Sequence, residues 1–174
     1  YDVQVYIGYP ASATPFADPA QGLELASAMY DDGVDIIWQV AGGTGTGVFQ
    51  AAADAGLYSI GVDVDQYISM SEQPELANTI VTSMLKNCGD MFVAAADLLI
   101  EGNYPGGELR RLGIADGAVG IAENDRYMEL VPEEIRTEIS AAVQKVVDGE
   151  VEIYSVLDDE ASWEAIKAEA TAAR

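Results

Sequence analysis

The 174-residue sequence predicts an α/β fold, a parallel sheet with helices on both of its faces. Apolar runs alternate with segments whose apolar residues recur at helical spacing. The connections are short, and one run, Val34–Ala41, is almost continuously apolar, as in parallel strands that are covered on both sides. The resulting β-α-β-α-β order implies right-handed crossovers.

The first expected strand is Val3–Tyr9, which is rich in β-branched and aromatic residues. A loop then leads to a helix, for which we expect Asp18 as the N-cap and Pro19 as the first residue. This helix should end at Gly33, because glycine suits the left-handed conformation at helix ends.

The second strand is expected at Val34–Ala41, with Trp38 in the core. A second helix stopped by Gly56 leads to a third strand at Leu57–Asp63. The apolar spacing that follows predicts a long helix at Thr82–Glu101.

A fourth strand is expected within Gly106–Gly117. The next helix has Pro132 near its start and two acidic residues, Glu133 and Glu134, in its first turn, where they complement the helix dipole. Residues 151–174 should form a short extended piece and a terminal helix.

The charge and the missing residue types exclude several functions. Thirty acidic residues against eight basic ones give a net charge of -22, which repels nucleic acids and anionic lipids. The absence of histidine excludes Ser-His-Asp triads and histidine metal sites. The single Cys88 forms no internal disulfide and no cysteine zinc site, and we expect it to be a buried structural thiol. We therefore expect no metal and no cofactor.

The chain starts without methionine and almost directly in a predicted strand. We expect that an amino-terminal part of a longer protein precedes it. The sequence shows no signal peptide and no apolar run of the ~20 residues that span a membrane.

Ligands of parallel α/β sheets bind at the carboxyl ends of the strands. Three loops should meet at that edge, namely 10–18, 42–47 and 64–78. The motif "GGTGTG" at Gly42–Gly47 lacks the third glycine of a dinucleotide fingerprint, since Val48 stands there, and it lacks the lysine of a P-loop. Its glycines either let the backbone approach an uncharged ligand or only permit a tight turn, and spacing alone favours the turn.

Acidic, basic and aromatic residues follow these strands. Asp63 and Asp65 should point to one side of an extended backbone, where a carboxylate can accept two hydrogen bonds from adjacent sugar hydroxyls. A solvated acidic loop is the alternative, and a metal site is a weaker one. Lys86 either assists this carboxylate or is an exposed helix lysine, and Phe16 either stacks on a flat ring or packs on the next helix.

With these residues placed, the sequence resembles the BMP (basic membrane protein) family, which comprises purine-nucleoside-receptor-like lipoproteins that bind solutes for ABC transporters. The resemblance rests on "FADPAQG", "DGVDIIWQVAGGTGTGVFQAAADAGLYSIGVDVDQ", "TSMLK" and "YPGGELRRLGIADGAVGIA". The matches keep their order from about Tyr6 to Ala122.

This resemblance implies the type I periplasmic-binding-protein fold, in which two α/β lobes enclose a nucleoside. The chain looks like the second lobe with the segments that return to the first. Residues 1–79 would form the second-lobe core, 80–112 a return segment with a helix that packs on the first lobe, and 113–174 the crossing back and the C-terminal helices.

The resemblance also implies a ligand site. Phe16 would stack on the purine, Gly42 and Gly43 would line the cleft with backbone, and Asp63 and Lys86 would bind the ribose. Asp116, in "IADGAVGIA", would support them from a crossing segment. Trp38 replaces a smaller aromatic residue of the family, and "NCGD" after Lys86 replaces a more basic continuation, so the preferred base can differ.

The implied function is non-catalytic capture of a nucleoside-like solute outside the cytoplasmic membrane. Its partner would be an ABC permease, and a lipid anchor is expected only if a preceding N-terminus carries one. No catalytic motif is evident, since the chain lacks histidine and G-x-S-x-G. The alternatives are a nucleoside- or sugar-processing enzyme and the ligand-sensing module of a regulator.

Overall fold

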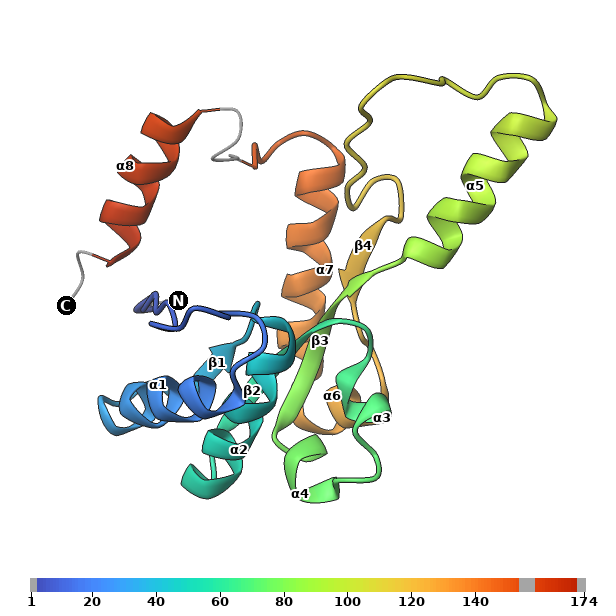
Figure 1. Ribbon diagram of the computed structural model, residues 1–174. Coiled ribbons are helices and arrows are strands. Elements are labelled where there is room, and N and C mark those ends of the chain that lie inside the picture. Colours follow the sequence, from blue (N-terminus) through green and yellow to red (C-terminus); the bar gives the residue numbers. More distant parts are fainter. Residues whose placement is uncertain (1–2, 154–158, 172–174) are drawn as a thin grey trace.

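A computed structural model describes residues 3–153 and 159–171 (Figure 1). Its sheet has four strands in the order β1-β2-β3-β4. Strands β1 (Ile36–Trp38), β2 (Tyr58–Asp63) and β3 (Ile80–Lys86) are parallel, whereas β4 (Val119–Ile121) runs antiparallel to β3. The predicted α/β class is therefore confirmed, with an antiparallel strand added at one edge.

Helices precede, connect and follow these strands. They are α1 (Pro19–Asp31), the short 3-10 helix η1 (Gly42–Thr44), α2 (Gly45–Ala55), α3 (Gln66–Ser69), α4 (Pro74–Ala77), α5 (Cys88–Ile100), α6 (Asp125–Leu130), α7 (Glu133–Val147) and α8 (Glu160–Thr171). No helix in the described part of the chain combines the length and apolarity needed to cross a membrane.

The core lies between the sheet and the pair α1 and α2. Ile37 of β1 meets buried residues of both helices there, including Tyr30 and Ala52. Glycines bring the two helices together, because a Cβ on Gly22 would overlap the backbone of Thr44 and a Cβ on Gly47 would overlap that of Pro19. On the opposite face α7 lies beside β4 (Figure 1).

The start of α1 follows the prediction. Asp18 is the N-cap, its Oδ1 accepts a hydrogen bond from the backbone N–H of Gln21 at 3.1 Å, and Pro19 is the first helical residue. The hydroxyl of Ser12 donates to Asp18 at 2.6 Å, and this bond holds the pKa of Asp18 below its usual value. The helix ends at Asp31, two residues before the predicted Gly33, with Asp32 as its C-cap, and Gly33 follows with a φ of 96°.

The strand predicted at Val3–Tyr9 is wrong. The segment has no regular secondary structure, and Val3 and Tyr9 are 69% and 72% exposed. It runs over α1 instead, since a Cβ on Gly8 would lie 3.2 Å from Leu25 and 3.3 Å from Met29. The outer side of the edge strand β1 is unpaired among the described residues, yet this segment does not join it.

Strand β1 is shorter than the predicted Val34–Ala41. Ile36 and Trp38 are 39% and 54% exposed, so this part of the sheet is covered on one face only and Trp38 is not in the core. The predicted cover on both faces is wrong for this strand.

The long helix predicted at Thr82–Glu101 is also wrong at its start. Residues up to Lys86 form β3, because pairing with β2 outweighs the local helical spacing, and the helix α5 begins at Cys88. Cys88 is exposed, which corrects the expectation of a buried thiol.

The strand predicted within Gly106–Gly117 is wrong, because these residues form turns and irregular backbone, and the strand that follows them, β4, begins at Val119. Helix α7 begins at Glu133 with Glu133 and Glu134 in its first turn, as expected. Residues 151–153 form no strand, residues 154–158 lie outside the described part, and the terminal helix is present as α8.

Candidate ligand-binding site

Strands β1, β2 and β3 are parallel, so their carboxyl ends lie on one edge of the sheet. The loop with Phe16 touches the glycine turn there: Gly43 N donates to Phe16 O at 2.9 Å. Gly42 has a φ of 55°, which favours glycine, and a Cβ on it would lie 3.0 Å from Phe16 O. The phenyl ring of Phe16 is exposed (66%), so it stands free beside an exposed backbone turn.

One buried hydroxyl fixes the loop on this turn. Thr44, only 2% exposed, accepts from the backbone N–H of Asp18 at 2.8 Å and donates to Pro15 O at 2.8 Å. Sequence reasoning missed Thr44. The available signal was a threonine inside a glycine turn, but a hydroxyl gives no indication of which distant backbone group it meets.

The ends of β2 and β3 carry an ion pair. Lys86 Nζ lies 2.7 Å from Asp63 Oδ1, and the two side chains are 52% and 51% exposed. Lys86 is the last residue of β3, and not a helix residue as predicted, and it reaches Asp63 because β3 is the neighbour of β2. An exposed ion pair contributes little to stability, but it offers a ligand an acceptor and a donor side by side.

Asp63 has a φ of 71° and is the one non-glycine with positive φ among the described residues. This conformation costs energy in most residues, although aspartate tolerates it better than many. It ends the extended backbone, so Asp63 and Asp65 do not share a side as expected.

Asp65 has a structural role instead. It caps α3, and its two carboxylate oxygens accept from Asn124 Nδ2 at 2.9 and 2.8 Å. Asn124 in turn accepts from Tyr127 N at 2.9 Å at the start of α6. Asp65 thereby ties the loop after β2 to the chain after β4.

Asp116 lies in the turn before β4. Its Oδ2 accepts from Gly113 N at 2.8 Å, and Asn87 holds the same turn by donating from Nδ2 to Gly117 O at 2.8 Å. The turn is therefore next to the end of β3, yet no hydrogen bond joins Asp116 to Asp63 or Lys86 in the described structure.

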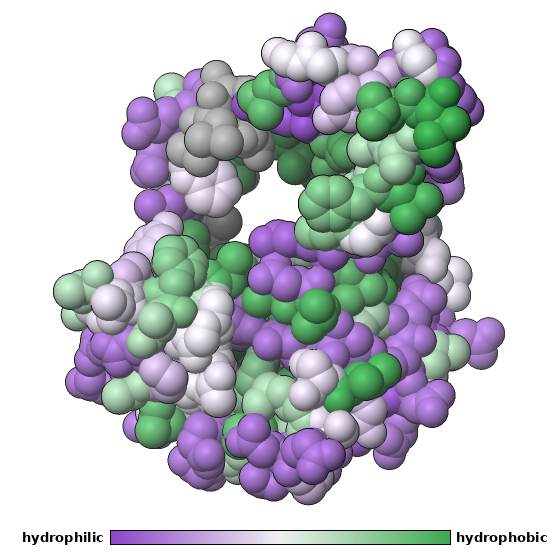
Figure 2. All heavy atoms as spheres, turned by 45° about the vertical axis from the view of Figure 1, so that its right-hand side comes forward, coloured by the Kyte–Doolittle hydropathy of each residue, from purple (hydrophilic) through white to green (hydrophobic). Residues whose placement is uncertain are grey.

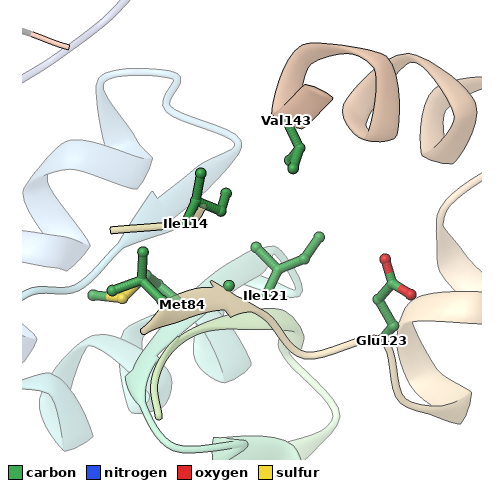
Figure 3. Close-up of a pocket in the computed structure, with 7 residues that line it drawn as sticks. Met84, Ile114, Ile121, Glu123 and Val143 are labelled. Atoms are coloured by element: carbon green, nitrogen blue, oxygen red, sulfur yellow. The ribbon is translucent and has the colours of Figure 1, made fainter. Parts of the chain in front are cut away.

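A separate hollow of about 380 Å³ lies between β4 and α7 (Figure 3). Its side chains are apolar except for one carboxylate, and none of the six predicted site residues lines it: Met84, Ile114, Val119, Gly120, Ile121, Glu123 and Val143. It offers few partners for a polar ligand. The described residues also contain no group of three or more potential metal ligands.

The mostly parallel sheet with its helices is consistent with the type I periplasmic-binding fold. The structure is similar to an ABC transporter solute-binding protein from Aeropyrum pernix K1, with a TM-score of 0.70, 24% identity, and coverage of 90% of this chain and 50% of that one. It is also similar to a structure from Bacillus halodurans described as a transcriptional activator of the comK gene (TM-score 0.66, 26% identity, covering 80% of this chain and 46% of that chain).

The sequence narrows this class to one family. A family model described as "ABC transporter substrate-binding protein PnrA-like" (Bmp) matches residues 2–156. The chain therefore belongs to this family, as its resemblance predicted.

Two curated relatives illustrate the match. The ABC transporter nucleoside-binding protein BmpA of Lactococcus lactis subsp. cremoris is 32% identical over 166 residues, which cover 88% of this chain and 45% of the relative. Basic membrane protein A of Borreliella afzelii is 32% identical over 154 residues, covering 86% of this chain and 43% of that protein. The chain thus spans less than half the length of these relatives.

Proposed function

We propose that this chain contributes one lobe of a nucleoside-binding component of an ABC importer. The observation that carries the proposal is the Asp63–Lys86 ion pair, which lies at the same sheet edge as the exposed Phe16 ring and the Gly42–Gly43 turn. The Lactococcus relative is named a nucleoside-binding protein, which supports the same ligand class.

Each group has a distinct chemical task. The Phe16 ring stacks on the base, worth about 1 kcal/mol beyond the area that it buries. The carboxylate of Asp63 accepts hydrogen bonds from ribose hydroxyls, and the ammonium of Lys86 donates to their oxygens, at about 1.5–3 kcal/mol for each charge-assisted bond. Gly42 and Gly43 let the ligand approach the backbone, and Asp116 supports the rim from its turn.

A second lobe completes the cleft in this proposal. The chain spans less than half of its relatives, so the other wall comes from a longer polypeptide or another chain. Within residues 80–112, α5 and the chain after it reach toward that lobe, whereas β3 belongs to the sheet of this one together with 1–79 and 113–174. Closure of the two lobes would exclude water from the ligand.

In this proposal the whole protein acts outside the cytoplasmic membrane, at the cell surface or in a periplasm, and delivers its ligand to an ABC permease. A lipid anchor belongs to it if the longer protein carries one. It binds the nucleoside without chemical change and needs no cofactor.

The test is a thermal-shift and calorimetry screen with adenosine, inosine, guanosine, uridine and free ribose. We expect nucleosides to bind, and chromatography after long incubation to recover them intact. Recovery of a free base would support a nucleoside-processing enzyme instead, and no binding by any nucleoside would contradict the proposal.

A ligand-sensing module of a regulator is the second candidate, because the Bacillus halodurans structure is described as a transcriptional activator. The two candidates differ in what adjoins the lobe. A DNA-binding domain in the longer polypeptide would favour regulation, and a lipid-anchored N-terminus would favour transport.

A further inference from the structure

We call the proposed ligand-binding residues at the sheet edge the rim, with one half formed by Phe16 and the Gly42–Gly43 turn and the other by Asp63 and Lys86. We propose that Gln39 and Gln66 are positioning residues that fix these two halves of the rim relative to each other. This inference rests on the proposed function of the rim. Gln39, 3% exposed, follows the last residue of β1, and Gln66 is the first residue of α3. Gln39 Nε2 donates to Gln66 Oε1 at 2.7 Å, which joins the ends of two strands through their side-chain amides.

The amide pair holds the backbone just before each half of the rim. Gln66 Oε1 also accepts from Val62 N at 2.7 Å, and Val62 directly precedes Asp63. Gln39 Oε1 accepts from Ala41 N at 3.2 Å, and Ala41 directly precedes Gly42.

The pair is anchored to a third strand as well. The backbone N–H of Gln66 donates to Ser83 Oγ at 3.1 Å, and Ser83 is a fully buried residue of β3. The hydrogen-bonded chain therefore spans the ends of β1, β2 and β3, the strands whose edge carries the rim.

These bonds have a fixed direction. Because Gln66 Oε1 accepts two hydrogen bonds, its partner Gln39 has to donate, and Gln39 Oε1 is left to accept from Ala41. The bond from Val62 N to Gln66 also explains why the pairing of β1 with β2 ends early. Its last bond to β2 is Gln39 N to Ile60 O, after which Val62 N pairs with a side chain instead of a β1 carbonyl.

Two glycines make room for the amides. A Cβ on Gly45 would overlap the side chain of Gln39, and a Cβ on Gly61 would lie 2.9 Å from Gln66 Oε1 and overlap Ser83. Gly45 belongs to the "GGTGTG" motif, so part of that motif serves the glutamine pair and not the ligand directly.

The pair matters because Asp63 has an unfavourable backbone, with a φ of 71°. Such a conformation persists in a non-glycine residue only when surrounding contacts hold it, and Gln66 bonds the N–H group of Val62 immediately before it. Gly42, with a φ of 55°, adopts its conformation without strain, but glycine is also flexible, and Gln39 bonds the N–H group of Ala41 immediately before it. Loss of the pair should let the Asp63 carboxylate and the glycine turn move independently.

The test uses the direction of the bonds. Inosine is titrated into the chain by NMR, which also measures weak affinities. Gln39→Glu replaces the amide that donates to Gln66 Oε1 by a carboxylate, so two acceptor oxygens face each other. Gln66→Leu removes the oxygen that accepts from Val62 N. Each variant should weaken inosine binding by about tenfold or more. Gln66→Glu keeps that acceptor and should recover most of the affinity lost in Gln66→Leu.

A matched control removes a buried hydrogen bond from the other end of the sheet. Ser59, fully buried at the start of β2, bonds Thr79 at 2.9 Å, so Ser59→Ala should lower the melting temperature and leave inosine affinity unchanged. If the glutamine variants behave like Ser59→Ala, with a lower melting temperature and normal affinity, their role is structural only and the inference is overturned.

Hydrogen exchange separates this inference from the function proposal. The amide protons of Ala41 and Val62 should be protected in the unmodified chain and should exchange at least about tenfold faster in Gln66→Leu. Unchanged exchange would overturn the bridge whatever the ligand. Faster exchange in a chain that binds no nucleoside would support the bridge and contradict only the proposed ligand.

Discussion

The exposed ring of Phe16 distinguishes this residue from the aromatic residues of the core. Its ring is 66% exposed although its backbone is bonded to Gly43, so burial does not explain an aromatic at this position. A ring held at its backbone and free at its side chain is suited to stacking on a ligand.

Replacement of this ring should therefore affect binding and not stability. Phe16→Leu should weaken purine nucleoside binding about fivefold, since stacking contributes about 1 kcal/mol, with little change in melting temperature. Phe92→Leu is the matched control, because Phe92 is also exposed (76%) but lies on α5. Calorimetry in which both variants bind equally well would remove Phe16 from the site.

At the residue scale the sequence indicated Phe16, Gly42 and Asp63 as candidates, because each follows a predicted strand and carries a recognisable chemistry. The structure places Phe16 against the Gly42–Gly43 turn and Asp63 beside Lys86, and their role in ligand binding stays a prediction. Gln39 and Gln66 were missed because neutral amides act through their partners, which are 27 residues apart in sequence. The positive φ of Asp63 was also invisible, since aspartate does not require it.

At the scale of elements, the contact between α1 and α2 depends on glycine. A Cβ on Gly47 would overlap the Pro19 carbonyl oxygen and lie 2.5 Å from Leu23 N, and neither backbone group moves without the helix. The close approach lets the pair cover Ile37 and the adjoining sheet.

Gly47→Ala should therefore destabilise the fold. Overpacking costs about 1–3 kcal/mol, and more where backbone is involved, which corresponds to a fall of about 2–4 °C in melting temperature per kcal/mol. The control is Gly89→Ala in α5, where a Cβ meets nothing within 4 Å, and alanine should be neutral or slightly stabilising. Equal melting temperatures for the two variants would contradict this account of the helix contact.

Elements with local signals were predicted well, and those that depend on partners were not. The Asp18 cap and Pro19 located α1 from neighbouring residues alone. Val3–Tyr9 has the composition of a strand but packs over α1 instead, and Thr82–Lys86 was predicted as helix but pairs with β2. Both outcomes depend on contacts between distant segments.

At the scale of the whole molecule, α5 stands away from the sheet (Figure 1). None of its residues is buried, and hydrophobic spheres gather over this region in Figure 2. Phe92, Val93, Leu99 and Ile100 are 76%, 62%, 67% and 83% exposed. Apolar surfaces of this kind mark places where another domain or chain binds.

The chain on its own should therefore self-associate at high salt, where its charge of -22 is screened. The double variant Phe92→Glu/Leu99→Glu should reduce association in sedimentation experiments without lowering the melting temperature. The control Met128→Glu/Val147→Glu adds the same charge at exposed positions outside α5 and should leave association unchanged. A monomeric unmodified chain at about 100 μM in high salt would contradict this expectation.

The most direct test of the account asks whether Asp63 binds ribose hydroxyls. Calorimetry compares inosine with 2′,3′-dideoxyinosine on the unmodified protein and on Asp63→Ala. We predict that Asp63→Ala weakens inosine binding by at least about tenfold and changes dideoxyinosine binding little, because only inosine has the 2′- and 3′-hydroxyls that donate hydrogen bonds to the carboxylate. Equal losses for both nucleosides, or no loss for either, would contradict the central claim.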